Sequence, residues 1–245
     1  MLIRRIEKET AQRFFQQYEH LGNCGLGVWH YGIYSEDNLI AVVSFGTVCF
    51  NPHRSSIGAI AAKYNLRVIQ LTRGGTKFDQ PKNTPSMSVS MALKQIRNDL
   101  GDMIVIAYSD IKWNEVGTIY QASNFSYLGM TNPKGQSNYF INGLPLSGWN
   151  VRKQYGTRKV ESLLNLGLLV EKKPLSQKHM YVYLNMCKTK KISIHKEIAT
   201  RLKPFPKRKD IGVGSMHEIW AARNIDLKNY EGARPNQSVI PSPHP

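Results

Sequence analysis

The chain has 245 residues, of which 41% are hydrophobic and 20% charged, so it can bury a real core in one large domain or in one domain with a small appendage. It contains no run of eighteen apolar residues, and its N-terminus lacks the apolar stretch of a signal peptide. We therefore expect a soluble protein of the cytoplasm with no membrane partner.

Basic residues dominate and are concentrated in one part of the chain. Lys and Arg number 33 against 17 Asp and Glu, which gives a net charge of +16 and a pI near 9.8. Residues 1–150 carry 14 basic and 10 acidic side chains, whereas residues 151–245 carry 19 and 7. A basic region with interleaved aromatic residues is typical of a protein that binds a polyanion, usually nucleic acid, although a merely solvated basic surface gives the same count.

The hydrophobic pattern of the first 150 residues predicts strands that alternate with helices. In chain order, the first half should contain a strand over Leu2–Glu7, a helix over Glu9–Leu21, a hairpin of Val28–Tyr34 with Leu39–Phe45, and a strand over Leu66–Leu71. We then expect a helix from Thr84 or Ser86 to about Leu100 and a strand over Met103–Tyr108. A helix over Glu115–Phe125 and a strand over Asn138–Ile141 should follow. Asn51–Tyr64 is expected to be a loop or an irregular insertion, and Thr72–Gly75 is expected to end the fourth strand.

This order predicts an α/β fold with a mixed twisted sheet flanked by helices, and it is also the order of the GNAT acyltransferase fold. After residue 150 we expect, in chain order, a short helix over Lys159–Leu166, a strand over Lys178–Leu184, a helix over Ile192–Leu202 and a short helix over Met216–Asn224. Residues 1–150 are thus predicted to form the catalytic domain, and residues 151–233 a basic C-terminal extension that packs on the core and contacts DNA. Residues 234–245, with four prolines, are predicted to be a mobile tail.

Cysteine and histidine spacing favours neither disulfides nor a metal site. Cys24, Cys49 and Cys187 are far apart and form no CxxC pair, so buried free thiols are expected. The seven histidines form no HxxxH or HxH pair, and no metal is predicted from spacing. A metal site built from residues distant in sequence stays open.

The most specific motif surrounds Asp110 and Tyr120. Tyr108-Ser109-Asp110 ends a predicted buried strand, and the block Gly117–Phe125, GTIYQASNF, follows it. The carboxyl edge of an open α/β sheet is where ligands bind, and a carboxylate there can act as a general base. Tyr120, about one turn into the next helix, can present its hydroxyl to the same cleft. The structural alternatives are a turn or N-cap role for Asp110 and a half-buried core position for Tyr120.

These blocks resemble the phage Mom family, whose members are GNAT-like enzymes. The resemblance extends from Arg73 to about Gly129 and continues more loosely into Lys178–Tyr183 and Pro206–Arg208. It implies a phage-encoded enzyme that converts the N6-amine of adenine in DNA to an N6-(carbamoylmethyl) form and so protects the DNA from restriction. Because that amine is paired inside a duplex, such an enzyme needs a flipped base or an open strand.

The resemblance also assigns roles to individual residues. It implies catalytic roles for Asp110, Tyr120, Arg73, His20 and a serine that is either Ser86 or Ser88, with Arg73 and Ser86 also contacting the cofactor. The family has Tyr after this histidine, whereas this chain has Leu21. The alternative for His20 is a surface histidine on a helix.

The cofactor prediction depends on the segment before the central helix. GNAT acetyltransferases hold the CoA pyrophosphate with a short Q/RxxGxG/A loop that leads directly into a helix. Here the largely polar eight-residue stretch Thr76–Asn83 separates Arg73-Gly74-Gly75 from the expected helix. The sequence therefore leaves an unknown acyl or aminoacyl donor, with acetyl-CoA possible but not supported by this loop.

DNA is the expected partner, and basic side chains after residue 170 are the predicted phosphate contacts. They are Lys172, Lys173, Lys178, Lys190, Lys191, Lys207, Arg208 and Lys209. Tyr181 and Tyr183 share one strand face, which favours core packing over stacking on bases.

Two other functions stay open. One is a GNAT-type N-acetyltransferase acting on protein or small-molecule amines, and the other is a non-catalytic DNA-binding protein. The basic C-terminal part, the Ile119–Phe125 block and the missing short phosphate loop favour DNA modification over the first. Asp110 at a strand end, beside a tyrosine-bearing helix, weighs against the second.

Overall fold

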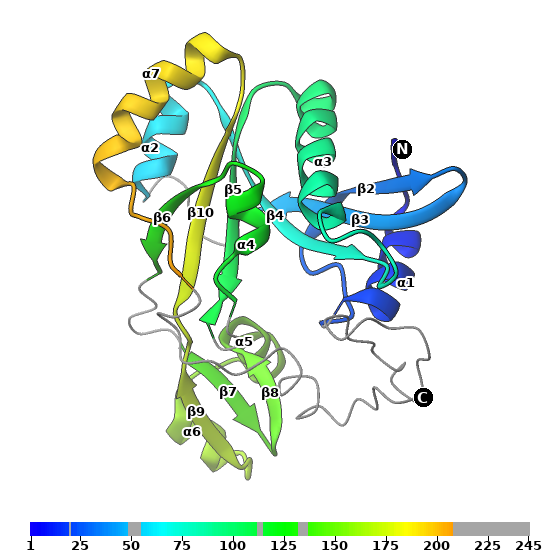
Figure 1. The fold of residues 1–245 in the computed structure, drawn as a ribbon. Coiled ribbons are helices and arrows are strands. Elements are labelled where there is room, and N and C mark those ends of the chain that lie inside the picture. Colours follow the sequence, from blue (N-terminus) through cyan, green and yellow to red (C-terminus); the bar gives the residue numbers. More distant parts are fainter. Residues whose placement is uncertain (20, 49–54, 112–114, 132–136, 208–245) are drawn as a thin grey trace.

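A seven-stranded mixed sheet forms the centre of the molecule, and a three-stranded antiparallel sheet is attached to it (Figure 1). The computed structural model describes residues 1–19, 21–48, 55–111, 115–131 and 137–207. The strands of the large sheet lie in the order β1 (Leu2–Arg5), β2 (Gly27–Ser35), β3 (Asn38–Thr47), β4 (Arg67–Thr76), β5 (Met103–Asp110), β10 (Lys178–Asn185) and β6 (Ser126–Met130). Among these described strands only the β4–β5 pair is parallel.

Helices cover both faces of this sheet, which confirms the predicted α/β class with a mixed sheet flanked by helices. α3 (Thr84–Leu100) and α4 (Thr118–Ala122) pack on the face that carries the main apolar cluster, and α2 (Ser56–Lys63) and α7 (Lys188–Ile198) pack on the opposite face. α1 (Lys8–Tyr18) packs on β2, β3 and β4, and a short 3-10 turn, Ala199–Arg201, follows α7. No helix within the described ranges is long and apolar enough to span a membrane.

The three-stranded sheet has a small core of its own. β7 (Ser137–Ile141) lies between β8 (Leu144–Ser147) and β9 (Val170–Pro174), with α5 (Gly148–Tyr155) and α6 (Val160–Asn165) beside it. Its buried side chains are Tyr139, Ile141, Val151 and Leu163. This sheet includes residues on both sides of the expected boundary at residue 150, and β10 lies inside the large sheet between β5 and β6, so the sheets divide the chain differently from the predicted domains.

The prediction of a loop over Asn51–Tyr64 is wrong for the described part of that segment. Ser55 caps α2 by accepting a hydrogen bond from the Gly58 N–H at 2.9 Å, and Ile57, Ile60 and Ala61 are buried. This short helix is stabilised because its apolar side packs on the sheet face beneath it. The expected helix over Met216–Asn224 lies outside the described residues.

The expectation that Thr72–Gly75 ends the fourth strand is also wrong, because β4 continues to Thr76. Gly74 and Gly75 pair with Val43 and Val42 of β3. A Cβ on Gly75 would lie in van der Waals contact with the Phe15 ring at 3.4 Å, so β4 passes under α1 at this residue, whereas a Cβ on Gly74 would meet nothing within 4 Å. The connection from β4 to α3 therefore starts after Thr76, and not at Arg73.

The predicted helix over Glu115–Phe125 is confined to Thr118–Ala122. Gly117 precedes it with a φ of +62°, and Asn124 follows it with a φ of 62°, so the backbone reverses at both ends. Of the cysteines predicted to be buried free thiols, Cys24 is buried and free, whereas Cys187 is free but exposed.

We expect Gly117→Ala to be much more destabilising than Gly143→Ala. Both glycines have positive φ, but a Cβ at Gly117 would lie 2.6 Å from the buried Tyr181 ring, whereas a Cβ at Gly143 would meet nothing within 4 Å. The strained backbone costs about 1–2 kcal/mol at either position, and overpacking adds about 1–3 kcal/mol at Gly117. Urea unfolding of both variants measures this difference, and equal losses would contradict the packing argument.

Candidate active site

The candidate site occupies the opening between β4 and β5. The two strands pair from Arg67↔Met103 to Gln70↔Ile106, and beyond that point β4 pairs with β3 while β5 pairs with β10. A bulge in the β3–β4 pairing between Ser44↔Arg73 and Phe45↔Leu71 leaves Thr72 as the extra residue. The carboxyl ends of the two parallel strands thus separate, and polar side chains gather there.

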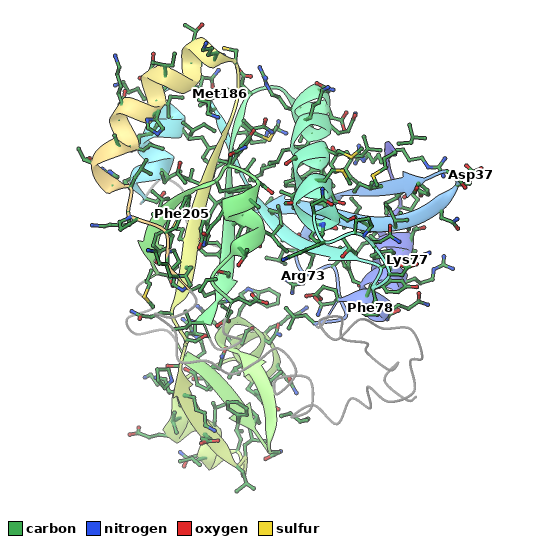
Figure 2. The ribbon with its side chains drawn as sticks, viewed as in Figure 1. Asp37, Arg73, Lys77, Phe78, Met186 and Phe205 are labelled. Carbon is green, nitrogen blue, oxygen red and sulfur yellow. The ribbon has the colours of Figure 1, made fainter. Side chains whose placement is uncertain are left out.

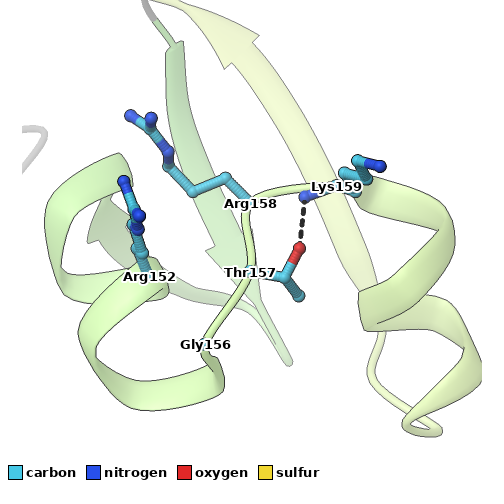
Figure 3. A pocket seen from close by; sticks show the side chains of 5 residues that line it. All are labelled: Arg152, Gly156, Thr157, Arg158 and Lys159. Carbon is cyan, nitrogen blue, oxygen red and sulfur yellow. Dashed lines mark hydrogen bonds between the residues drawn. The ribbon is translucent and has the colours of Figure 1, made fainter.

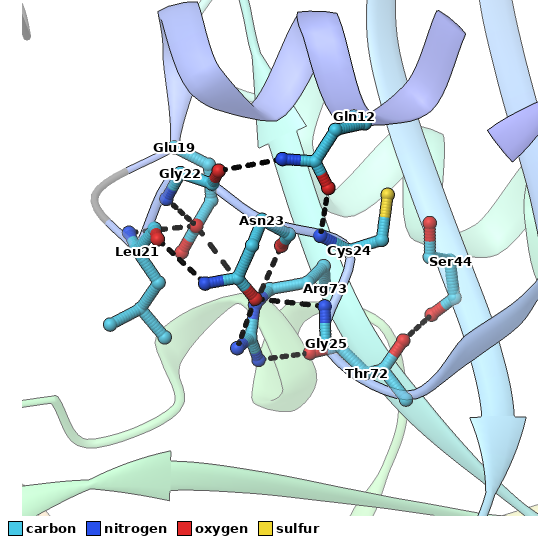
Figure 4. A network of polar contacts seen from close by, with 10 residues as sticks. All are labelled: Gln12, Glu19, Leu21, Gly22, Asn23, Cys24, Gly25, Ser44, Thr72 and Arg73. Atoms are coloured by element: carbon cyan, nitrogen blue, oxygen red, sulfur yellow. Dashed lines mark hydrogen bonds and ion pairs between the residues drawn. The ribbon is translucent and has the colours of Figure 1, made fainter. Parts of the chain in front are cut away.

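Arg73 lies near the middle of the molecule, below α3 (Figure 2). The segment that follows α1 wraps around its guanidinium (Figure 4). Arg73 Nε donates to the Asn23 main-chain oxygen at 3.1 Å, Nη2 donates to Asn23 Oδ1 at 3.2 Å, and Nη1 donates to the Thr72 carbonyl at 2.7 Å. A Cβ on Gly25 would lie 3.3 Å from the guanidinium carbon, so the backbone approaches the cation closely. Of the five N–H donors of this group, two have no bonded partner among the described residues.

Glu19 places a buried carboxylate beside Arg73. Its Oε2 lies 4.0 Å from Arg73 Nε and accepts N–H hydrogen bonds from Leu21 at 2.8 Å and Gly22 at 3.1 Å. Burial raises the pKa of Glu19, and the Arg73 charge and these two N–H groups oppose that rise. Glu19 therefore orients Arg73 and partly neutralises it.

Asp110 ends β5 and is held from the neighbouring strand. Ser176 Oγ donates to its Oδ1 at 3.1 Å, and Lys178 Nζ lies 3.4 Å from its Oδ2. Its backbone N–H points at Glu115 Oε2 at 3.4 Å. The prediction that Asp110 lies at the carboxyl end of a buried strand is confirmed.

Tyr120 lies on α4, and its hydroxyl donates to the Tyr108 main-chain oxygen at 3.3 Å. Its ring packs on Tyr181 and Phe125, with centroids 5.4 and 5.5 Å apart. Burial raises the pKa of Tyr120 far above its ordinary value, Glu115 raises it further, and Arg73 lowers it. The phenol is therefore neutral at physiological pH, and it can donate a proton or a hydrogen bond.

The two candidate serines have different surroundings on α3. Ser86 is half-buried, its hydroxyl donates to the Asn83 carbonyl at 3.1 Å, and its own carbonyl accepts from Ser123 Oγ of the α4 C-cap at 3.2 Å. Ser88 Oγ is buried without a hydrogen-bond partner, as is Thr84 Oγ1 at the start of the helix. Ser86 is thus the serine that lies against α4, and a role for either serine stays a prediction.

The lysines predicted to contact DNA do not form one surface. Lys178 forms an ion pair with Asp110, at the last residue of β5. Lys190 forms one with Asp102 at 3.0 Å, and Asp102 immediately precedes the first residue of β5. The two ion pairs are therefore separated by the length of that strand, roughly 25 Å. Lys172 and Lys173 lie on β9 with their ammonium groups over the Tyr139 and Phe140 rings. Lys191 lies over the Tyr183 ring, and Tyr181 and Tyr183 fill the core as predicted.

Some predicted residues cannot be placed. His20, Arg208 and Lys209 lie outside the described residues, and Lys207 is the last residue described. Within the described ranges, no group of three or more His, Cys, Asp or Glu side chains is arranged to hold a metal ion.

The sequence prediction missed Glu19, Asn23 and Glu115. Asn23 and Gly22 look like an ordinary helix cap, and Glu115 looks like the start of a helix. The sequence signal for this part of the site is the polar turn Gly22–Gly25 that follows an amphipathic helix. That turn does not reveal its partner, because Arg73, which binds Asn23, is 50 residues further along the chain.

The fold and these side chains define an α/β protein with a polar site at an opened sheet edge, built from an arginine, carboxylates and a neutral tyrosine. The chain matches the Mom protein family over residues 1–207, and it belongs to that family. It is 32% identical over 101 residues to the methylcarbamoylase mom of Escherichia phage Mu. That match spans 41% of this chain and 41% of the phage Mu protein.

Solved acetyltransferases are similar to this chain at a lower level. A Bacillus subtilis acetyltransferase in complex with CoA is 11% identical with a TM-score of 0.39, and the match covers 74% of this chain and 97% of that one. The IAA acetyltransferase of Bacillus cereus is 10% identical with a TM-score of 0.41, with 75% and 98% covered.

We predict that Glu19→Gln changes the pH dependence of stability. Because burial raises the pKa of Glu19 above 4.5 in the folded protein, the folded state holds this proton more tightly than the unfolded state does. Wild-type stability should therefore fall, relative to the variant, as the pH rises from about 4.5 through the folded pKa. Urea unfolding across that range measures the difference.

The matched control is Glu161→Gln, which changes an exposed glutamate on α6. Its stability difference from wild type should stay constant across the same pH range. If wild type instead gains stability relative to Glu19→Gln as the pH rises, Arg73 rather than burial dominates at this carboxylate.

Proposed function

We propose that this protein is a DNA-modifying transferase of phage type that converts the N6-amine of adenine in DNA to an N6-(carbamoylmethyl) form. Membership of the Mom protein family over residues 1–207 is the observation that carries this proposal. The named activity of the phage Mu relative agrees with it. The modified DNA would resist restriction, and the enzyme would act in the cytoplasm of the host cell.

The chemistry of the site fits transfer to a weakly nucleophilic amine. The lone pair of the adenine N6-amine is delocalised into the ring, so attack is helped by a base that accepts the amine proton. Asp110 is the carboxylate at the strand end that would accept this proton, and Lys178 and Ser176 contact its two oxygens and orient it. Tyr120, neutral and half-buried, can give a proton or a hydrogen bond to an oxygen on which charge develops.

Arg73 and Ser86 are the residues that would hold the donor. The two guanidinium N–H groups of Arg73 with no bonded partner among the described residues can bind a carboxylate or phosphate in bidentate geometry. The donor would be an acyl or aminoacyl compound; acetyl-CoA could be bound there, but transfer of its acetyl group alone would give an N6-acetyl group and would not supply the amide nitrogen of the carbamoylmethyl product. The pyrophosphate of acetyl-CoA would have to be bound by the loop 77–83 and by the start of α3. At the start of α3, Thr84 Oγ1 and Ser88 Oγ have no hydrogen-bond partner.

Nucleoside mass spectrometry of DNA from cells that express the chain tests the proposal. We expect modified adenosine with the wild type, and its loss in Asp110→Asn and Tyr120→Phe, each by at least about a hundredfold because general acid–base groups contribute that much. The absence of any modified adenosine with the wild type would sink the proposal.

The matched controls are Asp37→Asn and Tyr34→Phe. Asp37 is exposed in the β2–β3 turn, and Tyr34 packs under Arg4 at the end of β2, so neither lies in the candidate site. Both should modify DNA at the wild-type level. If Asp110→Asn or Tyr120→Phe does so as well at equal expression, the role of that residue is wrong.

A further inference from the structure

A cluster of cations on the small sheet has no role in the candidate site. Arg152 and Lys153 lie in the last turn of α5, and Arg158 and Lys159 lie just before α6. The segment from residue 137 to residue 174 holds six basic side chains and only two acidic ones, Glu161 and Glu171. Glu171 pairs with Lys173 at 3.0 Å, so it does not neutralise this cluster.

The loop between α5 and α6 forms a shallow hollow of about 360 Å³, lined by Arg152, Gly156, Thr157, Arg158 and Lys159. Figure 3 shows the Arg152 and Arg158 side chains pointing to the same side of this loop, while Lys159 points away. Both arginines are exposed, and neither guanidinium forms an ion pair or a hydrogen bond with the described residues. Two unpaired guanidinium groups on one side of a hollow suit one phosphate group.

The backbone under the hollow is fixed by hydrogen bonds, so the positions from which the two arginine side chains extend are set before any ligand binds. Gly156 caps α5 with a φ of +73°, and its amide donates to the Arg152 carbonyl at 2.9 Å. The buried Tyr139 donates its hydroxyl to the Arg158 carbonyl at 3.1 Å. The Arg158 side chain passes over Gly148, where a Cβ would lie 3.5 Å from its Cδ.

The small sheet is joined to the large one beside the candidate site. β9 ends at Pro174, and Ser176, two residues later, donates to the Asp110 carboxylate. An exposed Trp149 lies on α5 with Lys153 Nζ 5.3 Å from its ring centroid, which adds an aromatic surface of the kind that nucleic acids contact. A polymer that enters the site at Asp110 therefore meets this sheet next.

We propose that the hollow at Arg152 and Arg158 binds a backbone phosphate of duplex DNA next to the modified adenine. This inference rests on the proposed function, because that function makes DNA the polymer at Asp110. It assigns phosphate contact to residues other than the lysines predicted from the sequence, of which Lys178 and Lys190 are already paired with Asp110 and Asp102.

The test measures the salt dependence of DNA binding by fluorescence anisotropy with a labelled duplex and the full chain. Each neutralised phosphate contributes about 0.9 to the magnitude of the slope of log K against log salt, so Arg152→Gln combined with Arg158→Gln, which removes the contact with one phosphate, should reduce that magnitude by about 1. Thermal melting checks that this double variant is folded. An unchanged slope in the folded double variant would overturn the inference.

The matched control combines Arg5→Gln and Lys94→Gln, two exposed cations on β1 and α3. It removes the same charge and should leave the slope unchanged, and an equal fall in both double variants would overturn the inference in favour of general charge. A duplex RNA of the same sequence is measured in parallel, and a fall seen with RNA alone would identify an RNA site instead.

Adenine modification by the wild type is measured on the same duplex DNA. If the slope falls as expected but no adenine is modified, the phosphate site stands and the proposed function fails. If adenine is modified and the slope is unchanged, the proposed function stands and the phosphate site fails.

Discussion

The parallel pairing of β4 with β5 stops after four residue pairs, and every feature of the candidate site follows from that separation. β4 leaves because Thr72 bulges out of its pairing with β3, and the strand then continues beside β3 and passes under the Phe14 and Phe15 rings of α1 at Gly75. β5 stays straight because β10 pairs with it along its whole length. The carboxyl ends of two neighbouring strands thus come to lie apart, with backbone and side-chain polar groups between them.

The opening is stabilised by charge as well as by strand geometry. Arg73 would be an uncompensated, largely buried cation without the segment after α1, which supplies the Glu19 carboxylate and the Asn23 oxygens. The opposite wall carries Glu115 and Asp110, and Lys178 and Ser176 hold the latter. A cation and several carboxylates in one partly buried opening give the site donors for an anionic group and an acceptor for a proton.

Local patterns were sufficient to predict the parts of the structure that are local. The compact apolar run Met103–Tyr108 predicted β5, the helical spacing of apolar residues up to Leu100 predicted α3, and the end of β5 placed Asp110 at the sheet edge. The four-residue β8, Leu144–Ser147, was missed because it is short and contains a proline. The continuation of β4 through Gly74 and Gly75 was missed because only its pairing with β3 stabilises it. Glu19 and Asn23 were missed because their role depends on Arg73, far away along the chain.

The central claim is that the opening between β4 and β5 receives the adenine base. Photocrosslinking with a duplex that carries one photoreactive adenine analogue tests this most directly, with the crosslinked peptides identified by mass spectrometry. The account predicts crosslinks in the peptides that contain Tyr108–Asp110, Gly117–Phe125 or Arg73, and competition by unlabelled duplex. Crosslinks confined to α2 and α7, on the opposite face of the sheet, would contradict it.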